Sequence, residues 1–460
     1  MIEIKNVSFK YSEKSRYNLK NINLHIESGE CVLLCGKSGC GKTTLTKVIN
    51  GLIPHFIEGV LEGKVISAGI DIADSKMYEL SSKIGSVFQN PKSQFFNIDS
   101  DSELAFGLEN EGMNPEYIKN RISDTISDLK IKRLLGRNIF KMSGGEKQAL
   151  AFASIYAMNP EVYVLDEPSA NLDINAIKIL KSQLKKIKES GKTVVIAEHR
   201  IYYLADLIDK VIYMEDGEVS QVFKREEFLK LDENQRKKMG LRTIKPIVTK
   251  LSNHLKKAKP NLIVSGLSYK NDKKYIFKDM NFSAAEGEVI GVLGNNGVGK
   301  TTLMRCLAGL IKEGDGKIKL NEIFLSQKKR NKACYMIMQD VNHQLFAESV
   351  WDECKLSKKK VEDNRVLSLL KEFNLDMYKE NHPMALSGGQ KQRLAIVTGI
   401  LADKKILIFD EPTSGLDYEN MCTVSRLIKS LSKEGHIIFI VTHDEEFLEI
   451  TCDRVIKTCN

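Results

Sequence analysis

The chain has 460 residues, of which 42% are hydrophobic and 28% are charged. This balance excludes a wholly disordered chain and allows two or three separate cores. The net charge of +9 lies in one stretch, because residues 236–260 hold nine Lys or Arg and no acid. Since the remainder is neutral overall, no nucleic-acid partner is expected. The apolar runs at 405–409 and 436–441 are far shorter than the roughly 20 residues that span a bilayer, and the N-terminus lacks a secretory pattern, so we expect a cytoplasmic protein.

The first element with a chemical signature is a glycine-rich loop. Residues 36–44 read GKSGCGKTT and follow the strand-like run CVLLC, the context that a phosphate-binding loop requires. The glycines let backbone N–H groups turn toward phosphates, and the start of the following helix adds positive potential. We expect Lys42 to pair with the β- and γ-phosphates and Thr43 to offer its hydroxyl to Mg²⁺.

A second candidate element is the apolar run at 162–167, VYVLDE, which ends in two acids. Neighbouring side chains at the end of a strand point to opposite faces. We therefore expect Asp166 to bind Mg²⁺ through water and Glu167 to polarise the attacking water. Alone, such an acidic strand end is more often a solubilising turn. Beside a phosphate loop it supplies the other half of a nucleoside triphosphatase site.

Residues 99–140 lie between these two elements and are polar, charged and helix-patterned, whereas the flanks carry short β-branched runs. The predicted fold is α/β, with a parallel-sheet core, an antiparallel β edge and a helical subdomain. Pro246 and Pro260 bracket the basic stretch, which indicates a linker over 236–260. A solvated linker is favoured over contact with anionic lipid headgroups.

The second half repeats the first in the same order. A phosphate loop recurs as GNNGVGKTT at 294–302, and two acids recur as ILIFDE at 406–411. By the same chemistry, Lys300, Thr301, Asp410 and Glu411 should act as their first-half counterparts. A helix-patterned insert recurs at 348–385. We predict domains at 1–235 and 261–460, separated by the basic linker.

The sequences SGGEKQ at 143–148 and SGGQKQ at 387–392 resemble the signature of ATP-binding-cassette (ABC) proteins, a family of P-loop ATPases. The resemblance covers essentially the whole chain and implies two ATP sites with Mg²⁺. It also implies roles for further residues. These are the glutamine loops Gln89 and Gln339, the D-loops ending at Asp173 and Asp417, the switch histidines His199 and His443, and Tyr11 and Tyr269 stacked on adenine.

The resemblance further implies a head-to-tail arrangement in which each phosphate loop meets the signature of the other half. Site one would combine Lys42, Asp166, Glu167 and His199 with Ser387 and Gly389. Site two would combine Lys300, Asp410, Glu411 and His443 with Ser143 and Gly145. The glutamines would contribute to catalysis and to Mg²⁺ binding. The other residues expected to bind ATP are Gly36, Ser38, Gly39, Gly41, Thr44, Gly294, Asn296, Gly297, Gly299 and Thr302.

Both sites keep an acid after the metal-binding Asp and a histidine, so both are predicted to hydrolyse ATP. The sequence departs from the family pattern at two positions. Glu146 replaces the commoner glutamine of the signature, and Ala149 stands where the second half has Arg393. These departures leave open whether the two sites work at equal rates.

Shorter segments resemble the energy-coupling-factor importers. FQNPKSQ at 88–94 and AFGLEN at 105–110 look like that group, and MQDVNHQLF at 338–346 and AEHR at 197–200 are similar to fused versions of its ATPase pair. The resemblance implies peripheral attachment to the cytoplasmic face of the membrane through a coupling (T-type) subunit and a small-molecule-binding subunit. The cargo would be a vitamin, a vitamin precursor or a metal ion.

The segments after Gln89 and Gln339 would then form a groove for helices of the coupling subunit, or else only the packed edge of the helical insert. Two other functions stay open. A soluble tandem ABC ATPase acting on the ribosome is expected to carry a long charged arm and NHLD-type D-loops, which this sequence lacks. The ATPase of a conventional sugar importer is the nearest rival, and the co-purifying membrane partner would distinguish it.

Overall fold

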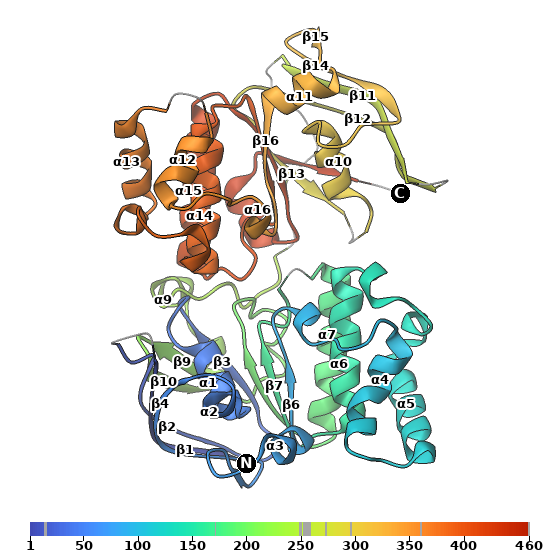
Figure 1. The fold of residues 1–460 in the computed structure, drawn as a ribbon, viewed down its shortest axis with the longest axis vertical. Helices are drawn as coiled ribbons and strands as arrows, with labels where there is room; N and C mark the ends of the chain where they lie inside the picture. Colours follow the sequence, from blue (N-terminus) through green and yellow to red (C-terminus); the bar gives the residue numbers. More distant parts are fainter. Residues whose placement is uncertain are drawn as a thin grey trace. The chain divides into compact units, whose positions relative to one another are not determined.

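The computed structural model describes residues 1–12, 16–170, 172–247, 251, 259–271, 274–294, 297–358 and 361–458. The chain divides into two compact units (Figure 1). The first unit comprises Met1–Pro246 with Asp417–Glu419, and the second comprises Ile247–Leu416 with Asn420–Asn460. Among the described residues, no helix has the length and apolar character needed to cross a bilayer.

The first unit is built on a six-stranded sheet with the strand order β10-β9-β3-β8-β7-β6. Its strands are parallel, except that β10 runs antiparallel to β9 at one edge. Every residue of β3 and β8 is buried, as expected for central parallel strands covered on both faces. The strands are β3 (Cys31–Gly36), β6 (Ile84–Val87), β7 (Val162–Asp166), β8 (Thr193–Ala197), β9 (Lys210–Glu215) and β10 (Glu218–Lys224).

A separate antiparallel sheet with the order β2-β1-β4-β5 completes the β structure of this unit. Alternate residues of β1 are buried, beginning with Ile2 and Ile4, and they join a core that also contains Val32 and Leu34 of β3. One face of the antiparallel sheet therefore packs into a core that it shares with the parallel sheet and with Leu45, Val48 and Ile49. Its strands are β1 (Ile2–Tyr11), β2 (Leu19–Ile26), β4 (Gly59–Ser67) and β5 (Ile70–Asp71).

The helices of the first unit fall into a group around the parallel sheet and a helical subdomain made of α4, α5 and α6 (Figure 1). The subdomain helices share a hydrophobic core with β7 and β8 that includes Leu104, Leu129 and Leu150. The helices are α1 (Lys42–Ile49), α2 (Leu52–His55), α3 (Met77–Lys83), α4 (Ser100–Asn110), α5 (Pro115–Leu129), α6 (Gly144–Met158), α7 (Ile174–Glu189), α8 (Arg225–Leu229) and α9 (Glu233–Lys238).

The second unit repeats this plan with a five-stranded sheet of order β16-β17-β18-β13-β19, all of it parallel. An antiparallel sheet of order β12-β11-β14-β15 accompanies it. The parallel strands are β13 (Val289–Leu293), β16 (Cys334–Ile337), β17 (Ile406–Asp410), β18 (Ile437–Val441) and β19 (Arg454–Lys457). The antiparallel strands are β11 (Leu262–Asn271), β12 (Lys274–Ala284), β14 (Asp315–Leu320) and β15 (Ile323–Phe324).

Helices α12, α13 and α14 form the subdomain of the second unit, and α10, α11, α15 and α16 lie around its sheets (Figure 1). Their bounds are α10 (Lys300–Leu307), α11 (Gln327–Ala333), α12 (Val350–Leu356), α13 (Asp363–Glu372), α14 (Gly388–Leu401), α15 (Tyr418–Lys433) and α16 (Glu445–Thr451). The α/β fold with a parallel core, an antiparallel sheet and a helical subdomain in each half is confirmed. The longer middle of the first half lies mainly in α4 and α5, with 11 and 15 residues against 7 and 10 in α12 and α13.

The basic stretch predicted as a linker begins inside α9. Asp232 caps this helix through its side chain, and beyond it Leu241 and Ile244 are buried in the core of the first unit. The stretch thus packs against the first unit as far as residue 244. This packing is possible because apolar side chains lie between the basic residues. The predicted boundaries at 235 and 261 stay a prediction.

Candidate functional site

The first phosphate loop joins β3 to α1, as its sequence context predicts. Gly39 and Gly41 have φ angles of 81° and 106°, a region that glycine enters without the penalty of a Cβ. A Cβ on Gly41 would lie 2.9 Å from the carbonyl oxygen of Asn18, whereas one on Gly39 would meet nothing within 4 Å. Gly41 is therefore required for packing, and Gly39 borders open space.

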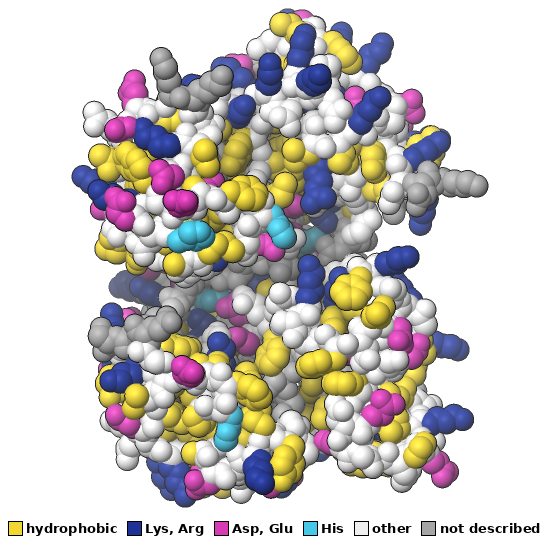
Figure 2. All heavy atoms as spheres, viewed as in Figure 1, with side chains coloured by type: hydrophobic (Ala, Val, Ile, Leu, Met, Phe, Trp, Pro, Cys, Tyr) yellow, Lys and Arg dark blue, Asp and Glu magenta, His cyan; other side chains and the backbone are white. Residues whose placement is uncertain are grey.

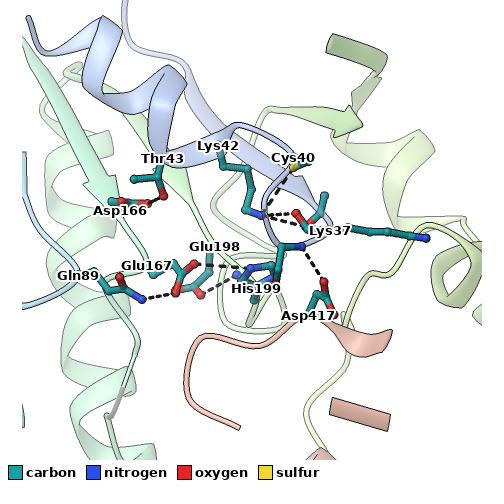
Figure 3. Close-up of polar contacts among 12 residues, drawn as sticks. Lys37, Cys40, Lys42, Thr43, Gln89, Asp166, Glu167, Glu198, His199 and Asp417 are labelled. Carbon is teal, nitrogen blue, oxygen red and sulfur yellow. Dashed lines mark hydrogen bonds and ion pairs between the residues drawn. The ribbon is translucent and has the colours of Figure 1, made fainter. Parts of the chain in front are cut away.

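Lys42 lies at the first residue of α1, and its ammonium group is folded back into the loop (Figure 3). The Nζ atom donates to the carbonyl oxygens of Gly36 at 3.0 Å and Lys37 at 3.1 Å, and it lies 3.8 Å from Sγ of Cys40. Lys42 is only 5% exposed. An ammonium group buried among loop carbonyls is positioned to exchange them for phosphate oxygens.

Thr43 and Asp166 come together although 123 residues separate them in the chain. The Thr43 hydroxyl donates to Oδ1 of Asp166 at 3.0 Å, which joins the start of α1 to the carboxyl end of β7 (Figure 3). Burial raises the pKa of Asp166, and the Thr43 hydrogen bond and the Lys42 charge oppose that shift. A buried carboxylate beside a hydroxyl is the kind of oxygen set that Mg²⁺ prefers.

Glu167 follows β7 and has a φ angle of 45°, which turns its side chain away from Asp166. Its Oε2 accepts a hydrogen bond from Nε2 of Gln89 at 2.7 Å, and its Oε1 lies 3.6 Å from Nε2 of His199. The structure thus brings together the predicted catalytic acid, glutamine and histidine of the first half (Figure 3).

Burial dominates the electrostatics of this group. Burial, followed by the charges of Glu198 and Asp166, raises the pKa of Glu167 to about 8. Burial also lowers the pKa of His199 well below its usual value, and the charges of Lys42 and Arg242 add to the shift. The imidazole is therefore neutral at physiological pH, with one ring nitrogen that donates a hydrogen bond and one that accepts.

Glu198 belongs to this cluster and was not among the predicted site residues. It is 2% exposed, and its Oε1 accepts from the backbone N–H groups of His199 at 2.7 Å and Arg200 at 3.1 Å. Its Oε2 accepts from the N–H of Ser169 at 3.2 Å and from the hydroxyl of Tyr203 at 2.9 Å. The only sequence signal was an acid directly before the histidine in AEHR. These four donors satisfy both oxygens of the buried Glu198 side chain.

The second phosphate loop joins β13 to α10. Nζ of Lys300 donates to the carbonyl oxygen of Gly294 at 2.7 Å and lies 3.0 Å from Nε2 of His443. Gly297 and Gly299 have φ angles of 80° and 91°. The predicted ATP ligand Asn296 lies outside the described residues. Lysine and switch histidine therefore meet directly in this half.

The acids of the second half repeat the first arrangement with one change of partner. The Thr301 hydroxyl donates to Oδ2 of Asp410 at 3.0 Å, and burial raises the pKa of Asp410. Oε1 of Glu411 lies 3.7 Å from Nε2 of His443, and its Oε2 accepts from the hydroxyl of Thr442 at 2.9 Å. Thr442 occupies the position before the histidine that Glu198 has in the first half. Gln339 follows β16 and is exposed.

Each signature serine caps the start of a subdomain helix. Ser143 precedes α6 and Ser387 precedes α14, and each accepts from the backbone N–H three residues on. Gly145 and Gly389 lie in the first turns of these helices. Helix starts with unpaired N–H groups favour anions.

The two tyrosines predicted to stack on adenine lie on the antiparallel sheets. Tyr11 is the last residue of β1, and Tyr269 lies near the end of β11. The hydroxyl of Tyr11 lies 3.2 Å from Oγ1 of Thr44 on α1, so this ring borders the first phosphate loop. Tyr269 stacks on Phe277, with 6.2 Å between the ring centroids. Ser38 is an exposed residue of the first loop, and Thr302 is partly buried on α10.

Comparisons with known proteins agree with this geometry. The family described as ABC transporter matches residues 19–170 and 277–414. The chain belongs to the ABC transporter family. It is therefore an ABC ATPase with two tandem ATP-binding domains, the ATP-binding subunit of a transporter that pairs with membrane subunits.

Relatives of similar length carry provisional names in the same family. The chain is 47% identical over 463 residues to an ABC transporter ATP-binding protein of Treponema denticola, with 99% of this chain and 95% of the relative covered. It is 32% identical over 494 residues to the HMP/thiamine import ATP-binding protein YkoD of Bacillus subtilis, with 99% and 89% covered.

A solved structure with a similar fold covers nearly the whole chain. An archaeal ribosome recycling factor, solved with the ribosomal stalk protein aP1, is 22% identical and has a TM-score of 0.65, with 98% of this chain and 87% of that chain covered. At this identity the likeness extends to the fold alone.

Proposed function

We propose that the chain is the fused ATPase of an energy-coupling-factor importer for a vitamin, a vitamin precursor or a metal ion. The observation that carries the proposal is the similarity over nearly the whole chain to YkoD, whose provisional name assigns it to HMP/thiamine import. The motifs at 88–94 and 105–110 support the same group. In this proposal the chain attaches to the cytoplasmic face of the membrane through a coupling subunit and a small-molecule-binding subunit.

A groove on the surface of the first unit is a candidate binding site for a helix of a membrane partner. Its cavity of ≈ 950 Å³ is lined by α3, α4 and α6 and by the segment after Gln89. Phe96 stacks on Phe106 at the groove with 4.9 Å between ring centroids, and Phe96 is 76% exposed. Figure 2 shows hydrophobic side chains on this face of the first unit. An apolar groove suits an amphipathic helix, and Gln89 links its edge to Glu167.

The proposed ATP cycle follows from the site residues. Each ATP would lie between the phosphate loop of one half and the signature of the other, closing the two halves. Glu167 and Glu411 would align the attacking water, and loss of the γ-phosphate would release the closed state. Thr43 with Asp166 and Thr301 with Asp410 would hold Mg²⁺, and the oxygen donors present fit that ion. Bound there, Mg²⁺ would neutralise charge on the β- and γ-phosphates.

Co-purification tests the importer proposal. The tagged chain, purified with detergent from the membranes of its own cells, should retain an integral membrane subunit and a second one carrying a vitamin, a precursor or a metal ion. Phe96→Glu should weaken this association, because it places a charge in the groove, and leave ATPase activity of the isolated chain intact. Phe56→Glu is the matched control, since Phe56 is 70% exposed and lies outside the groove. Recovery of a sugar permease, or of ribosomes, would contradict the proposal.

A further inference from the structure

The signature of the first half carries an ion pair, whereas the corresponding residues of the second half are neutral. Glu146 is the residue that replaces the commoner glutamine, and its Oε1 accepts from Nη1 of Arg137 at 2.5 Å. Nη2 of the same guanidinium lies 3.5 Å from Oε2. The fork of an arginine thus faces both oxygens of the carboxylate, a geometry that adds direction as well as charge.

Glu146 also holds the signature serine. Its Oε2 accepts from the backbone N–H and from the hydroxyl of Ser143, both at 2.9 Å, while its own N–H donates to the Ser143 hydroxyl oxygen at 3.3 Å. The arginine therefore orients a carboxylate that in turn orients the serine at the start of α6. Arg137 lowers the pKa of Glu146 against the effect of burial, so this carboxylate is ionised.

The backbone of Arg137 is fixed by the subdomain. Its carbonyl oxygen accepts from the N–H of Ser100 at 3.0 Å, and its N–H donates to the Ser100 hydroxyl at 3.1 Å. Ser100 is the first residue of α4. These two hydrogen bonds join the segment that leads to the signature to the start of α4, and they fix the position from which the guanidinium of Arg137 extends.

The second half has the same joint with neutral residues. The carbonyl oxygen of Asn381 accepts from the N–H of Val350, the first residue of α12, at 3.0 Å. Asn381 lies six residues before Ser387, as Arg137 lies six before Ser143. Gln390 replaces Glu146, and its Oε1 accepts from the N–H of Ser387 at 2.8 Å. Arginine with glutamate in one half therefore corresponds to asparagine with glutamine in the other.

An ionised carboxylate beside a signature serine opposes the approach of a phosphate, because like charges repel and the effect grows as water is excluded. We infer that Arg137 is a positioning residue of the ATP site completed by the first signature, where it neutralises Glu146 and directs it toward Ser143 so that the start of α6 can receive the terminal phosphate. This inference rests on the proposed function, in which that signature faces the nucleotide held by Lys300.

Exchange of the pair for its second-half equivalents tests the inference in the full chain. Arg137→Asn leaves Glu146 unneutralised and should raise the KM for ATP by about fivefold to tenfold, as expected for roughly one unpaired charge near a phosphate. Glu146→Gln in the same chain should return the KM to within about twofold of the original value. Because salt screens charge, about 1 M KCl should reduce the effect of Arg137→Asn. Loss of folding alone would be neither rescued by Glu146→Gln nor relieved by salt.

An unchanged KM in Arg137→Asn, or a double variant no better than the single one, would overturn the inference. Ser143→Phe separates this from the proposed function, because a bulky side chain should block any phosphate that meets the first signature. If Ser143→Phe impairs ATP hydrolysis and Arg137→Asn does not, only the charge inference fails. If Ser143→Phe also has no effect, the first signature does not meet a nucleotide and both fail.

Discussion

The side-chain amide of Gln89 donates a hydrogen bond of 2.7 Å to the carboxylate of Glu167. The loop that borders the apolar groove is thereby connected to the acid that follows β7. His199 approaches the other oxygen of the same carboxylate at 3.6 Å. A change in the groove can therefore reach the candidate water-aligning group through a single side chain.

Replacement of the acids tests their role in hydrolysis. Glu167→Gln and Glu411→Gln together should lower kcat by about 10²- to 10⁴-fold, the usual range for loss of a general base, and leave ATP binding intact. The variant should accumulate with ATP bound, as measured by retention of labelled ATP after gel filtration. Normal turnover in the double variant would remove both residues from the mechanism.

The raised pKa of Glu167 predicts a pH dependence of stability for the nucleotide-free chain. Its pKa shifts from 4.5 to about 8 on burial, so between these values the folded state binds more protons than the unfolded state. Folding stability should therefore decline as pH rises through this window. Glu167→Gln removes the titration, so its gain in Tm over the natural chain should grow from pH 6 to pH 9. If the difference in Tm between Glu167→Gln and the natural chain does not change with pH, the pKa of Glu167 is not raised by burial and this account is contradicted.

Cys40 allows the first phosphate loop to be modified by a thiol reagent. Cys40 is 5% exposed and burial raises the pKa of its thiol, so N-ethylmaleimide should react slowly with it and faster with the more exposed Cys422. Inhibition of ATPase activity should follow the slow phase, and MgATP should delay it. Cys40→Ala should resist inhibition under the same conditions. Inhibition of Cys40→Ala at the original rate would place the sensitive thiol elsewhere.

The four hydrogen bonds of Glu198 predict a graded loss of stability. Tyr203→Phe removes one donor and should cost about 1 kcal/mol, whereas Glu198→Gln turns an N–H₂ group toward N–H or O–H donors and should cost about 1–3 kcal/mol. Denaturant unfolding measures both. Glu198→Gln should also lower ATPase activity, because the carboxylate of Glu198 accepts a hydrogen bond from the backbone N–H of His199 and helps to place that residue. A Glu198→Gln variant as stable as the natural chain would contradict the network.

Much of the site follows from sequence because its parts are local. The phosphate loops, the acids at the ends of β7 and β17 and the signature serines each lie at a strand end or a helix start that the surrounding residues specify. The meeting of each phosphate loop with the acid at the end of β7 or β17, at one edge of a parallel sheet, then follows from the topology.

The contacts that cross between segments could not be predicted in the same way. Arg137 reaches Glu146 because the α4 joint fixes its backbone, and Glu198 reaches Ser169 through a turn of the backbone that no spacing rule describes. The packing of the described start of the basic stretch could not be predicted for a similar reason. Its charge indicated a linker, yet Leu241 and Ile244 are buried in the core of the first unit.

The central claim is that a nucleotide bound to one phosphate loop meets the signature of the other half. Photocleavage with trapped vanadate tests it directly, because vanadate in the γ-phosphate position cuts the backbone that touches it. In a Lys300→Ala chain, where only the first loop binds MgADP and vanadate, light should cut the chain near Ser38 and near Ser387. Cuts confined to the first half, near Ser38 and Ser143, would contradict the account.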